Sequence, residues 1–298
     1  MPQKKEVYEL EQSPLCRMTG KKFKQLFRFT RNELKKLEND GCYHCWTVEE
    51  TGRRIETPCG KLKMFHARLA ELLARIKTPE YVYSKPKRSF VDNAAVHLGC
   101  TKLIKTDIRH FFPNVSIKKV RDLFLNRFHC PSDIAEMMAS LSCFQGHLPT
   151  GSEISLYLAY WSNEAMFHEI HDLVSRSGCR MSVYVDDITI SGQGASKELL
   201  TEVMRIINQH DLPVNRKKSK LLTAQRKYNK VTGVILVKDK LEIPNSLRKK
   251  KHEALVKLNF AKNKAEKDDL KQQIIGIDSA MKQISQHSVR EVAGKCQI

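Results

Sequence analysis

The sequence predicts an α+β fold around a mixed or antiparallel sheet. Helical and strand patterns alternate along its 298 residues, which is typical of this class. Two short runs of strand-forming residues, 183–185 and 188–190, are separated only by Asp186 and Asp187, so they predict a hairpin. A composition of 41% hydrophobic and 29% charged residues is ordinary for a globular protein.

The charge of the chain is unusual. It carries 52 Lys and Arg against 33 Asp and Glu, a formal net charge of +19. Such an excess predicts an anionic partner, most commonly nucleic acid, with a membrane surface as the competing idea. No run approaches the roughly 20 apolar residues of a spanning helix. The first residues do not resemble a signal peptide, so we expect a cytoplasmic protein with no membrane partner.

Apolar residues at helical spacing predict most of the elements. Helices are expected at residues 20–40, 61–77, 117–128, 132–143, 151–171 and 197–209. Strand patterns occupy residues 102–108 and 231–243, and residues 42–58 follow a short irregular pattern. After Pro244 the chain is basic and helical, which predicts a separate C-terminal subdomain.

Nine cysteines, an odd number, are scattered along the chain, and this favours reduced thiols over a disulfide framework. Cys42 and Cys45 have a spacing that suits zinc, with Cys59 and His66 as the nearby extra ligands. No second CxxC follows, so ordinary thiols are the alternative.

Two adjacent carboxylates at a hairpin turn repel each other unless a cation lies with them. Asp186 and Asp187 therefore predict either a solvated acidic turn or a Mg²⁺ site. Paired-metal sites take carboxylates from separate segments, and Asp107, which closes the strand pattern 102–108, is the natural third ligand. Phe112 follows it, either as a ring beneath a nucleotide sugar or as a core residue. Residues 213–230 hold seven Lys or Arg and no acid, which predicts phosphate binding.

Three stretches in this order resemble motifs A, B and C of reverse transcriptases: LIKTDIRHFFPNVS, HLPTGSEIS and YVDDITISG. Asn93-Ala-Ala-Val-His97 resembles the NAxxH element of bacterial retron reverse transcriptases, and Val231-Thr232-Gly233 resembles their VTG element. The resemblance covers roughly residues 42 to 245. It implies a right-hand polymerase: fingers with an N-terminal helical region (1–103), an antiparallel-sheet palm (104–243, with fingers helices at 116–145) and a helical thumb (244–298).

Specific roles follow from matching positions. The resemblance implies that Asp107, Asp186 and Asp187, with the backbone carbonyl of Ile108, bind two Mg²⁺ ions, for which Mn²⁺ is a substitute. Lys218 matches the motif D lysine that protonates departing pyrophosphate, with Lys217 and Lys220 as alternatives.

Other matches concern the nucleotide and the RNA. Arg54, or alternatively Arg53, matches a residue that grips the triphosphate, and Phe112 matches the ring that screens the 2′ side. Thr150-Gly151 matches a Gln-Gly step that lines the nucleotide and template pocket in the family, so Thr150 stands where Gln is usual. Glu153 belongs to a segment that departs from the family pattern, and we expect it either to contact the incoming base or to cap a helix that starts near Ser152. The RNA-handling elements are Asn93, His97, Val231, Thr232 and Gly233, for which a structural Asn and a core His are the alternative.

The resemblance implies RNA-directed DNA synthesis from dNTPs. A structured noncoding RNA would serve as template and as primer through a 2′-hydroxyl, giving a branched RNA–DNA product within an anti-phage defence system. A separate effector (toxin) protein is the implied partner, and higher-order assembly is left open. The alternatives are another defence-associated or intron-type reverse transcriptase, or a non-catalytic RNA-binding scaffold.

Overall fold

The computed structural model of the chain describes residues 7–29, 33, 37, 42–223 and 228–295. The chain divides into two compact units. The first unit comprises residues 1–80, 107–173 and 202–215, and the second comprises residues 81–106, 174–201 and 216–298. The mixture of helices with antiparallel strands confirms the predicted α+β class.

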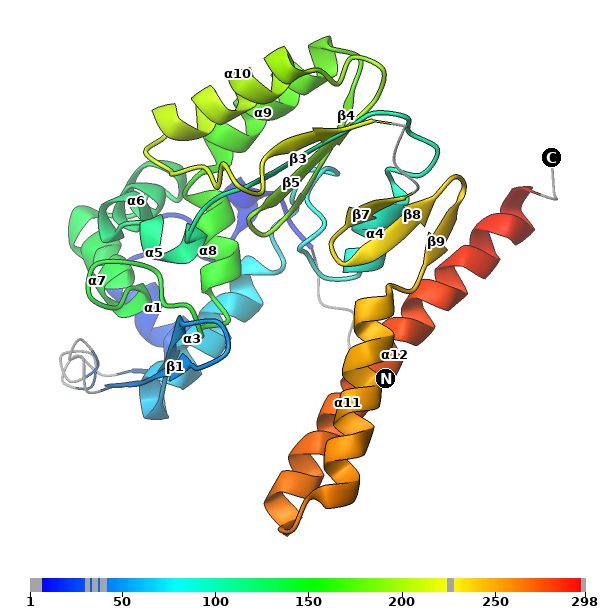
Figure 1. Ribbon diagram of the computed structural model, residues 1–298. Coiled ribbons are helices and arrows are strands. Elements are labelled where there is room, and N and C mark those ends of the chain that lie inside the picture. The colour runs from blue at the N-terminus through cyan, green and yellow to red at the C-terminus, as the bar shows by residue number, and fades with distance from the viewer. Residues whose placement is uncertain (1–6, 30–32, 34–36, 38–41, 224–227, 296–298) are drawn as a thin grey trace. The chain divides into compact units, whose positions relative to one another are not determined.

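The first unit is mainly helical (Figure 1). Its elements are η1 (Leu10–Gln12), α1 (Gly20–Phe27), β1 (Tyr43–Val48), β2 (Arg53–Pro58), α3 (Gly60–Leu73), α5 (Phe111–Asn114), α6 (Ile117–Asp122), the π-helix η3 (Leu123–Arg127), α7 (Ser132–Ser142) and α8 (Ser155–Trp161). Helices α9 (Glu164–Arg176) and α10 (Lys197–Gln209) continue from one unit into the other.

The N-terminal helix is shorter than its sequence pattern. Thr19 caps α1 by accepting a hydrogen bond from the backbone N–H of Lys22, and Arg28, at φ 58°, ends the helix. Residues 30–32, 34–36 and 38–41 of the predicted helix 20–40 lie outside the described residues. The rings of Phe23 and Phe27 pack against Phe65 of α3, so the apolar stripe of each helix forms core.

The sequence pattern of residues 42–58 is short and irregular, yet β1 and β2 form a regular antiparallel hairpin, with its turn at residues 49–52 and its second strand ending at Pro58. Most residues of β1 are exposed, and only the second half of β2 is buried. A strand with solvent on most of its surface lacks the apolar alternation by which strands are recognised. This is why the sequence pattern missed the hairpin.

The single helix predicted for residues 151–171 is also wrong, because α8 ends at Trp161 and α9 begins at Glu164. Between them, Asn163 donates its side-chain amide to the carbonyl of Ala159 at 2.8 Å and accepts a hydrogen bond from Lys119 at 2.9 Å. Asparagine competes for backbone hydrogen bonds in this way and favours helix ends. The start is later than predicted too, and the N-cap position Ile154 has no side-chain cap, so Glu153 does not cap α8.

The second unit contains the largest sheet. Its four strands lie in the order β4 (Arg180–Tyr184), β5 (Asp187–Ser191), β3 (Leu103–Asp107) and β6 (Lys220–Leu222). Strand β4 pairs antiparallel with β5, and β3 pairs antiparallel with β6. The predicted hairpin is confirmed, but its turn lies one residue earlier than expected, at Val185 and Asp186, because Asp187 already pairs with Tyr184.

A second sheet consists of β7 (Asn229–Val231), β8 (Val234–Val237) and β9 (Lys240–Glu242). Helix α4 (Phe90–Ala95) lies against this sheet (Figure 1). They share one hydrophobic core with the start of β3 and the C-terminal helix: Val91, Ala94, Leu103, Leu222, Val231, Val234, Leu236, Leu241 and Ile284.

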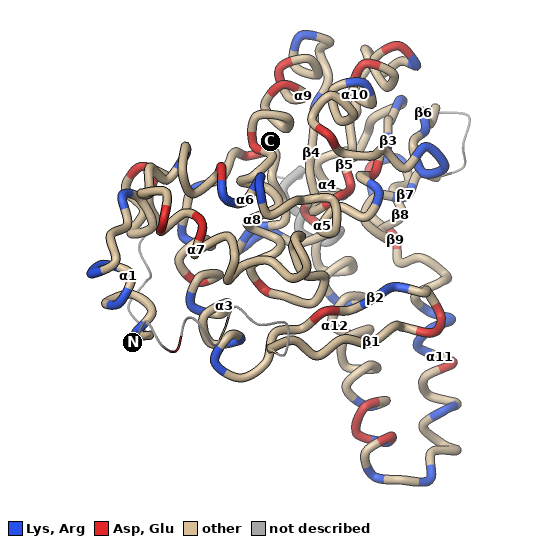
Figure 2. The backbone as a smooth tube through the Cα atoms, turned by 90° about the vertical axis from the view of Figure 1, so that its left-hand side faces the viewer, with Lys and Arg blue, Asp and Glu red and all other residues tan. Residues whose placement is uncertain are grey.

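Two long helices complete the second unit: α11 (Asn245–Phe260) and α12 (Lys264–Lys295) pack side by side (Figure 1). Four consecutive basic residues, 248–251, lie on α11, and Figure 2 shows Lys and Arg along this helix. Across the part of the chain that the structure describes, no helix is both long and apolar enough to cross a membrane.

Candidate functional site

The acidic pair occupies the tip of the β4–β5 hairpin. The side chains of Asp186 and Asp187 are half-buried, Asp186 in the turn and Asp187 as the first residue of β5. Val185 precedes them at φ 60°, in the left-handed region that a β-branched residue rarely adopts. Unfavourable backbone of this kind gathers at functional sites. The hairpin therefore projects two adjacent carboxylates on a constrained turn.

Asp107 is the last residue of β3 and is only 4% exposed. Within the first unit, Asn215 holds it twice: its backbone N–H donates to the Asp107 carbonyl at 2.8 Å, and its side-chain amide donates to Oδ1 at 2.9 Å. The next residue, Ile108, is fully buried and bridges antiparallel to Val214. A charged carboxylate with so little exposure needs such donors.

The segment after Asp107 turns through His110, at φ 47°, into α5. Phe111 is buried, whereas Phe112 is half-buried, with ring centroids 6.0 Å apart. Phe111 also meets Phe167 edge-on at 6.3 Å, which makes it the core residue of the pair. Phe112 therefore remains partly accessible, five residues after Asp107.

Strand β3 also carries a cation. Burial lowers the pKa of Lys105, and Asp187 opposes that shift by its negative charge, while Lys220, Lys230 and Lys218 add to it. Lys218 is exposed and lies in the short segment between Asn215 and β6. Several like charges so close together favour an anion in their neighbourhood.

In the first unit, the β1–β2 hairpin and the loop before α8 are joined through Glu56, which is only 3% exposed. Its carboxylate accepts hydrogen bonds from His147 at 3.1 Å and from the backbone N–H of Thr150 at 3.4 Å, and it pairs with Arg54 at 3.4 Å. The Thr150 hydroxyl donates to the Arg54 carbonyl at 2.7 Å. Three predicted nucleotide-binding residues are thus brought together: Arg54, Thr150 and Gly151.

Gly151 is required there by close packing. Its N–H donates to the Glu56 carbonyl at 3.0 Å, and a Cβ at this position would lie 2.9 Å from that same oxygen and 2.9 Å from Cγ2 of Ile55. Those approaches are shorter than side chains tolerate. Arg53 and Arg54 are both exposed, and the Arg54 guanidinium lies 5.8 Å from the Phe144 ring centroid.

The two elements matched to retron enzymes meet inside the second unit. Thr232 and Gly233 form the turn between β7 and β8, both with positive φ, 42° and 87°. Two-residue hairpins require this and favour Gly. The Thr232 hydroxyl donates to the Phe90 carbonyl at 2.7 Å, and the Asn93 amide reaches it at 3.4 Å. Val231 is buried beside them.

His97 is 1% exposed and lies between two serine hydroxyls, Nδ1 2.6 Å from Ser191 and Nε2 2.7 Å from Ser182. Burial, with a smaller contribution from Arg180, lowers the pKa of His97 to about 3. Asn93 is 0% exposed. Asn93 and His97 therefore lie in the interior, as the alternative of a structural Asn and a core His predicts, and neither side chain reaches solvent.

The residues around the β1–β2 hairpin do not favour a zinc site at Cys42 and Cys45. Cys45 and Cys59 are exposed, and both ring nitrogens of His66 already have partners, Ser152 at 2.6 Å and the Leu141 carbonyl at 2.7 Å. Among the described residues, no group of three or more His, Cys, Asp or Glu lies close enough together to hold a metal ion.

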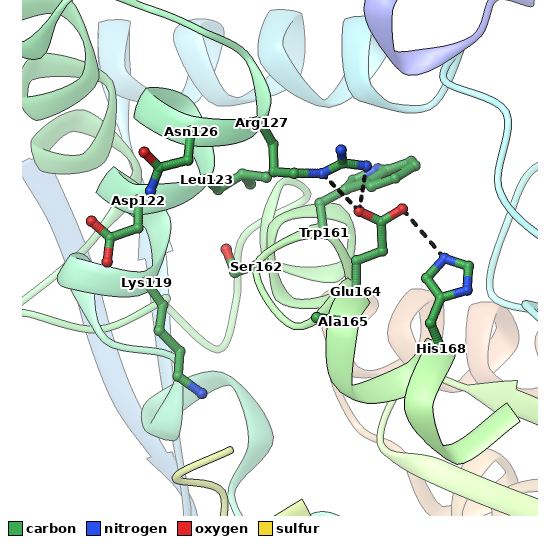
Figure 3. Close-up of a pocket in the computed structure, with 10 residues that line it drawn as sticks. All are labelled: Lys119, Asp122, Leu123, Asn126, Arg127, Trp161, Ser162, Glu164, Ala165 and His168. Atoms are coloured by element: carbon green, nitrogen blue, oxygen red, sulfur yellow. Dashed lines mark hydrogen bonds and ion pairs between the residues drawn. The ribbon is translucent and has the colours of Figure 1, made fainter. Parts of the chain in front are cut away.

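A separate pocket of the first unit is lined by α6, η3 and the α8–α9 region (Figure 3). Within it, Glu164 accepts two hydrogen bonds from Arg127, at 3.0 and 2.7 Å, and lies 3.5 Å from His168. None of the residues predicted to act on nucleotide, metal or RNA lines this pocket.

Two residues beside the predicted site went unnoticed in the sequence. Asn215 opens the basic stretch 215–220, and Glu56 stands among arginines and threonines. Their roles depend on partners 108 and 94 positions away, Asp107 and Thr150. No local pattern marks such contacts.

Comparison with known proteins adds an independent observation. Residues 50–264 match the family described as "Reverse transcriptase (RNA-dependent DNA polymerase)". Relatives include the retron Ec48 and Ec86 reverse transcriptases of Escherichia coli, each 27% identical, over 60% and 67% of this chain and 45% and 65% of their own length. The retron Se72 reverse transcriptase of Salmonella heidelberg is 29% identical over 61% of this chain and 50% of its own. The chain thus spans about half to two thirds of these relatives. The resemblance predicted from the motifs is confirmed.

Proposed function

Because the chain belongs to the reverse transcriptase family, we propose that it is an RNA-directed DNA polymerase of the retron type. The observation that carries the proposal is the pair Asp186 and Asp187 at the tip of the β4–β5 hairpin, within the region that matches the family. The right-hand division into fingers, palm and thumb belongs to the same proposal.

The carboxylates of Asp107, Asp186 and Asp187, with the carbonyl of Ile108, are proposed to bind two divalent metal ions. Carboxylate and carbonyl oxygens are the donors that Mg²⁺ and Mn²⁺ take, although among the described residues the three carboxylates do not lie close enough together to form a metal-binding group. Asp107 is oriented by Asn215, and Asp187 begins the strand next to the one that Asp107 ends. When bound, such ions lower the pKa of an attacking hydroxyl and neutralise charge on the leaving pyrophosphate.

Positively charged side chains supply the remaining electrostatics. We assign Lys218 to the protonation of pyrophosphate, because it is an exposed amine in the cluster of lysines around Lys105. Arg54 is assigned to the triphosphate, since its side chain is exposed although it pairs with Glu56. Charge clamps of this kind are usually a large part of phosphoryl-transfer catalysis.

Neutral groups would shape the nucleotide pocket. Thr150 and Gly151 hold the hairpin that carries Arg54, so they fix the position of that arginine. Phe112 offers a half-buried ring a few residues after Asp107, where it would exclude a 2′-hydroxyl by contact with the sugar. Selection of dNTPs over ribonucleotides follows from that contact.

The template would be a structured noncoding RNA that also primes synthesis through a 2′-hydroxyl, which gives a branched RNA–DNA product. Helix α11, with Arg248 and three following lysines, suits the phosphates of the template–primer duplex. A role in anti-phage defence together with a separate effector protein is proposed by analogy with the retron group.

The activity is tested by primer extension on an RNA template with Mg²⁺ and dNTPs. Wild-type protein should extend the primer, and Asp186→Asn should abolish extension, because an amide cannot replace the anionic ligand. Asp172→Asn is the control, since Asp172 on α9 is 69% exposed. Undiminished extension by Asp186→Asn would refute the site assignment.

The retron assignment is tested by sequencing nucleic acid that copurifies with the protein. One dominant RNA joined to DNA through a 2′–5′ bond supports the proposal. A random population of cellular RNA contradicts it, even if the protein extends primers in the first assay.

A further inference from the structure

A buried histidine connects the two strands of the acidic hairpin at their base. His97 contacts Ser182 on β4 and Ser191 on β5, and both serines are at most 1% exposed. Ser182 precedes Asp186 by four residues, and Ser191 follows Asp187 by four. In the register of the hairpin Ser182 pairs with Thr189, so Ser191 lies two residues farther from the turn than Ser182 does.

The register places these serines on one face of the hairpin. Arg180 pairs with Ser191, Ser182 with Thr189, and Tyr184 with Asp187. Because side chains alternate between faces, these residues all project from the same face. His97 thus contacts the face to which the carboxylate of Asp187 belongs. A change in strand register or twist at the serines would be passed directly to Asp187 and the turn.

The chemistry of His97 suits a fixed link. With a pKa near 3, the ring is neutral at physiological pH and offers one N–H donor and one acceptor. One serine must then donate to the ring while the other accepts from it. A link of this kind in a dry interior is costly to leave incomplete, because each unpaired polar group costs about 1–3 kcal/mol.

His97 is itself held by a rigid support. Arg180 donates to the carbonyl of Val96 at 2.7 Å, which ties β4 to the end of α4 a second time. Within α4, Asn93 reaches Thr232 of the β7–β8 turn. Asp92 forms a capping box with Ser89 and lies 3.3 Å from His287 of α12. The histidine therefore projects from an element fixed on several sides.

We propose that His97 is a positioning residue that sets the register and twist of the β4–β5 hairpin and thereby orients the side chains of Asp186 and Asp187. The NAxxH and VTG elements then act together as an internal support of the hairpin and not as RNA contacts. The hydrogen bond between Asn93 and Thr232 is the second contact of this support. The kinetic consequence rests on the proposed function, whereas the effect on the hairpin does not.

The experiment compares His97→Leu, which removes both hydrogen bonds, with His97→Gln, whose amide keeps one donor and one acceptor. Asn163→Leu is the matched control, because Asn163 is a buried polar residue with two side-chain hydrogen bonds in the first unit. Hydrogen exchange of residues 180–191, followed by mass spectrometry, reports on the hairpin without requiring activity. Single-nucleotide extension reports kcat and KM, and RNA affinity is measured in parallel.

His97→Leu should raise exchange across the hairpin about tenfold and lower kcat about 10–100-fold, since small misplacements of reacting groups have effects of this size. KM for dNTP and RNA affinity should change by less than about twofold. His97→Gln should recover part of both losses. Asn163→Leu should leave hairpin exchange and kcat unchanged below its melting temperature.

Unchanged hairpin exchange in His97→Leu overturns the proposal, as does a loss of RNA affinity with normal exchange and kcat. If wild-type protein extends no primer, the polymerase proposal fails, and hydrogen exchange alone tests the positioning role of His97. Should His97→Leu not fold, Ser191→Ala removes one hydroxyl of the link and should raise exchange in the same residues. Unchanged exchange in that variant overturns the proposal equally.

Discussion

Asn215 donates both its backbone N–H and its side-chain amide to Asp107, at 2.8 and 2.9 Å. The two residues are 108 positions apart, and the double contact fixes both the backbone and the carboxylate of Asp107. A carboxylate held in this way has a defined orientation. Residues that orient a proposed ligand in this manner are expected to matter nearly as much as the ligand.

Asn215→Ala should lower kcat for primer extension about 10-fold, because the Asp107 carboxylate loses the donor that orients it. Melting temperature should fall, because the buried carboxylate loses a hydrogen-bond donor, whereas KM for dNTP should change little. Asn208→Ala is the control, since Asn208 is an exposed residue of α10. Equal kcat in Asn215→Ala and wild type would contradict an orienting role.

Gly151→Ala should weaken the attachment of the β1–β2 hairpin, because the added methyl would lie 2.9 Å from the Glu56 carbonyl oxygen. Overpacking of this kind costs about 1–3 kcal/mol. We expect a lower free energy of unfolding in urea and a higher KM for dNTP, since the hairpin carries Arg54. Gly20→Ala is the control: nothing lies within 4 Å of a Cβ there. Identical KM values in Gly151→Ala and wild type would show that the attachment does not affect the nucleotide.

Val185→Gly should leave the free energy of unfolding unchanged or raise it by up to about 1 kcal/mol. Glycine adopts the observed φ of 60° without the clash of a Cβ, although it loses more backbone entropy on folding. Val183→Gly, in the same hairpin, should destabilise by about 2–4 kcal/mol, because Val183 is 1% exposed and its loss leaves a cavity. Urea unfolding measures both. A destabilisation of Val185→Gly equal to that of Val183→Gly would exclude strain at the turn.

Acid should destabilise the protein through its two buried histidines. Burial lowers the pKa of His66 to about 4 and that of His97 to about 3, whereas both have values near 6.5 when unfolded. The unfolded chain therefore binds more protons below pH 6.5, and stability present above that pH is lost as the pH falls. Between pH 7 and pH 5 each histidine contributes a loss of about 2 kcal/mol.

Guanidinium unfolding at pH 7 and pH 5 measures this loss. The His66→Gln variant should show about half of the wild-type pH dependence, because one of the two histidines is gone. A free energy of unfolding that is equal at the two pH values would show that neither ring stays neutral in the folded protein.

The prediction of elements succeeded where a run of apolar residues marks a buried helix face or a buried strand. Helix α3 presents Phe65 and Leu69 to the core at helical spacing, and β5 lies within a clear run of β-branched residues. It failed where the decisive interaction was distant. Lys119 bonds to Asn163 across 44 positions at the break between α8 and α9, and the exposed strand β1 lacks an apolar pattern.

The sequence by itself determined which functional groups the protein carries: the acidic pair, the third carboxylate and the excess of basic residues. It also determined the order of motifs that match one family. These features depend only on residue identity and on spacing along the chain. Only the tertiary structure decided which side chains meet. His97 faces inward, where it is the hydrogen-bond partner of two buried serines, and Asn93 faces inward with its amide 3.4 Å from the partly buried Thr232 hydroxyl. Such pairings depend on chain segments about 85 to 140 positions apart, which no local pattern specifies.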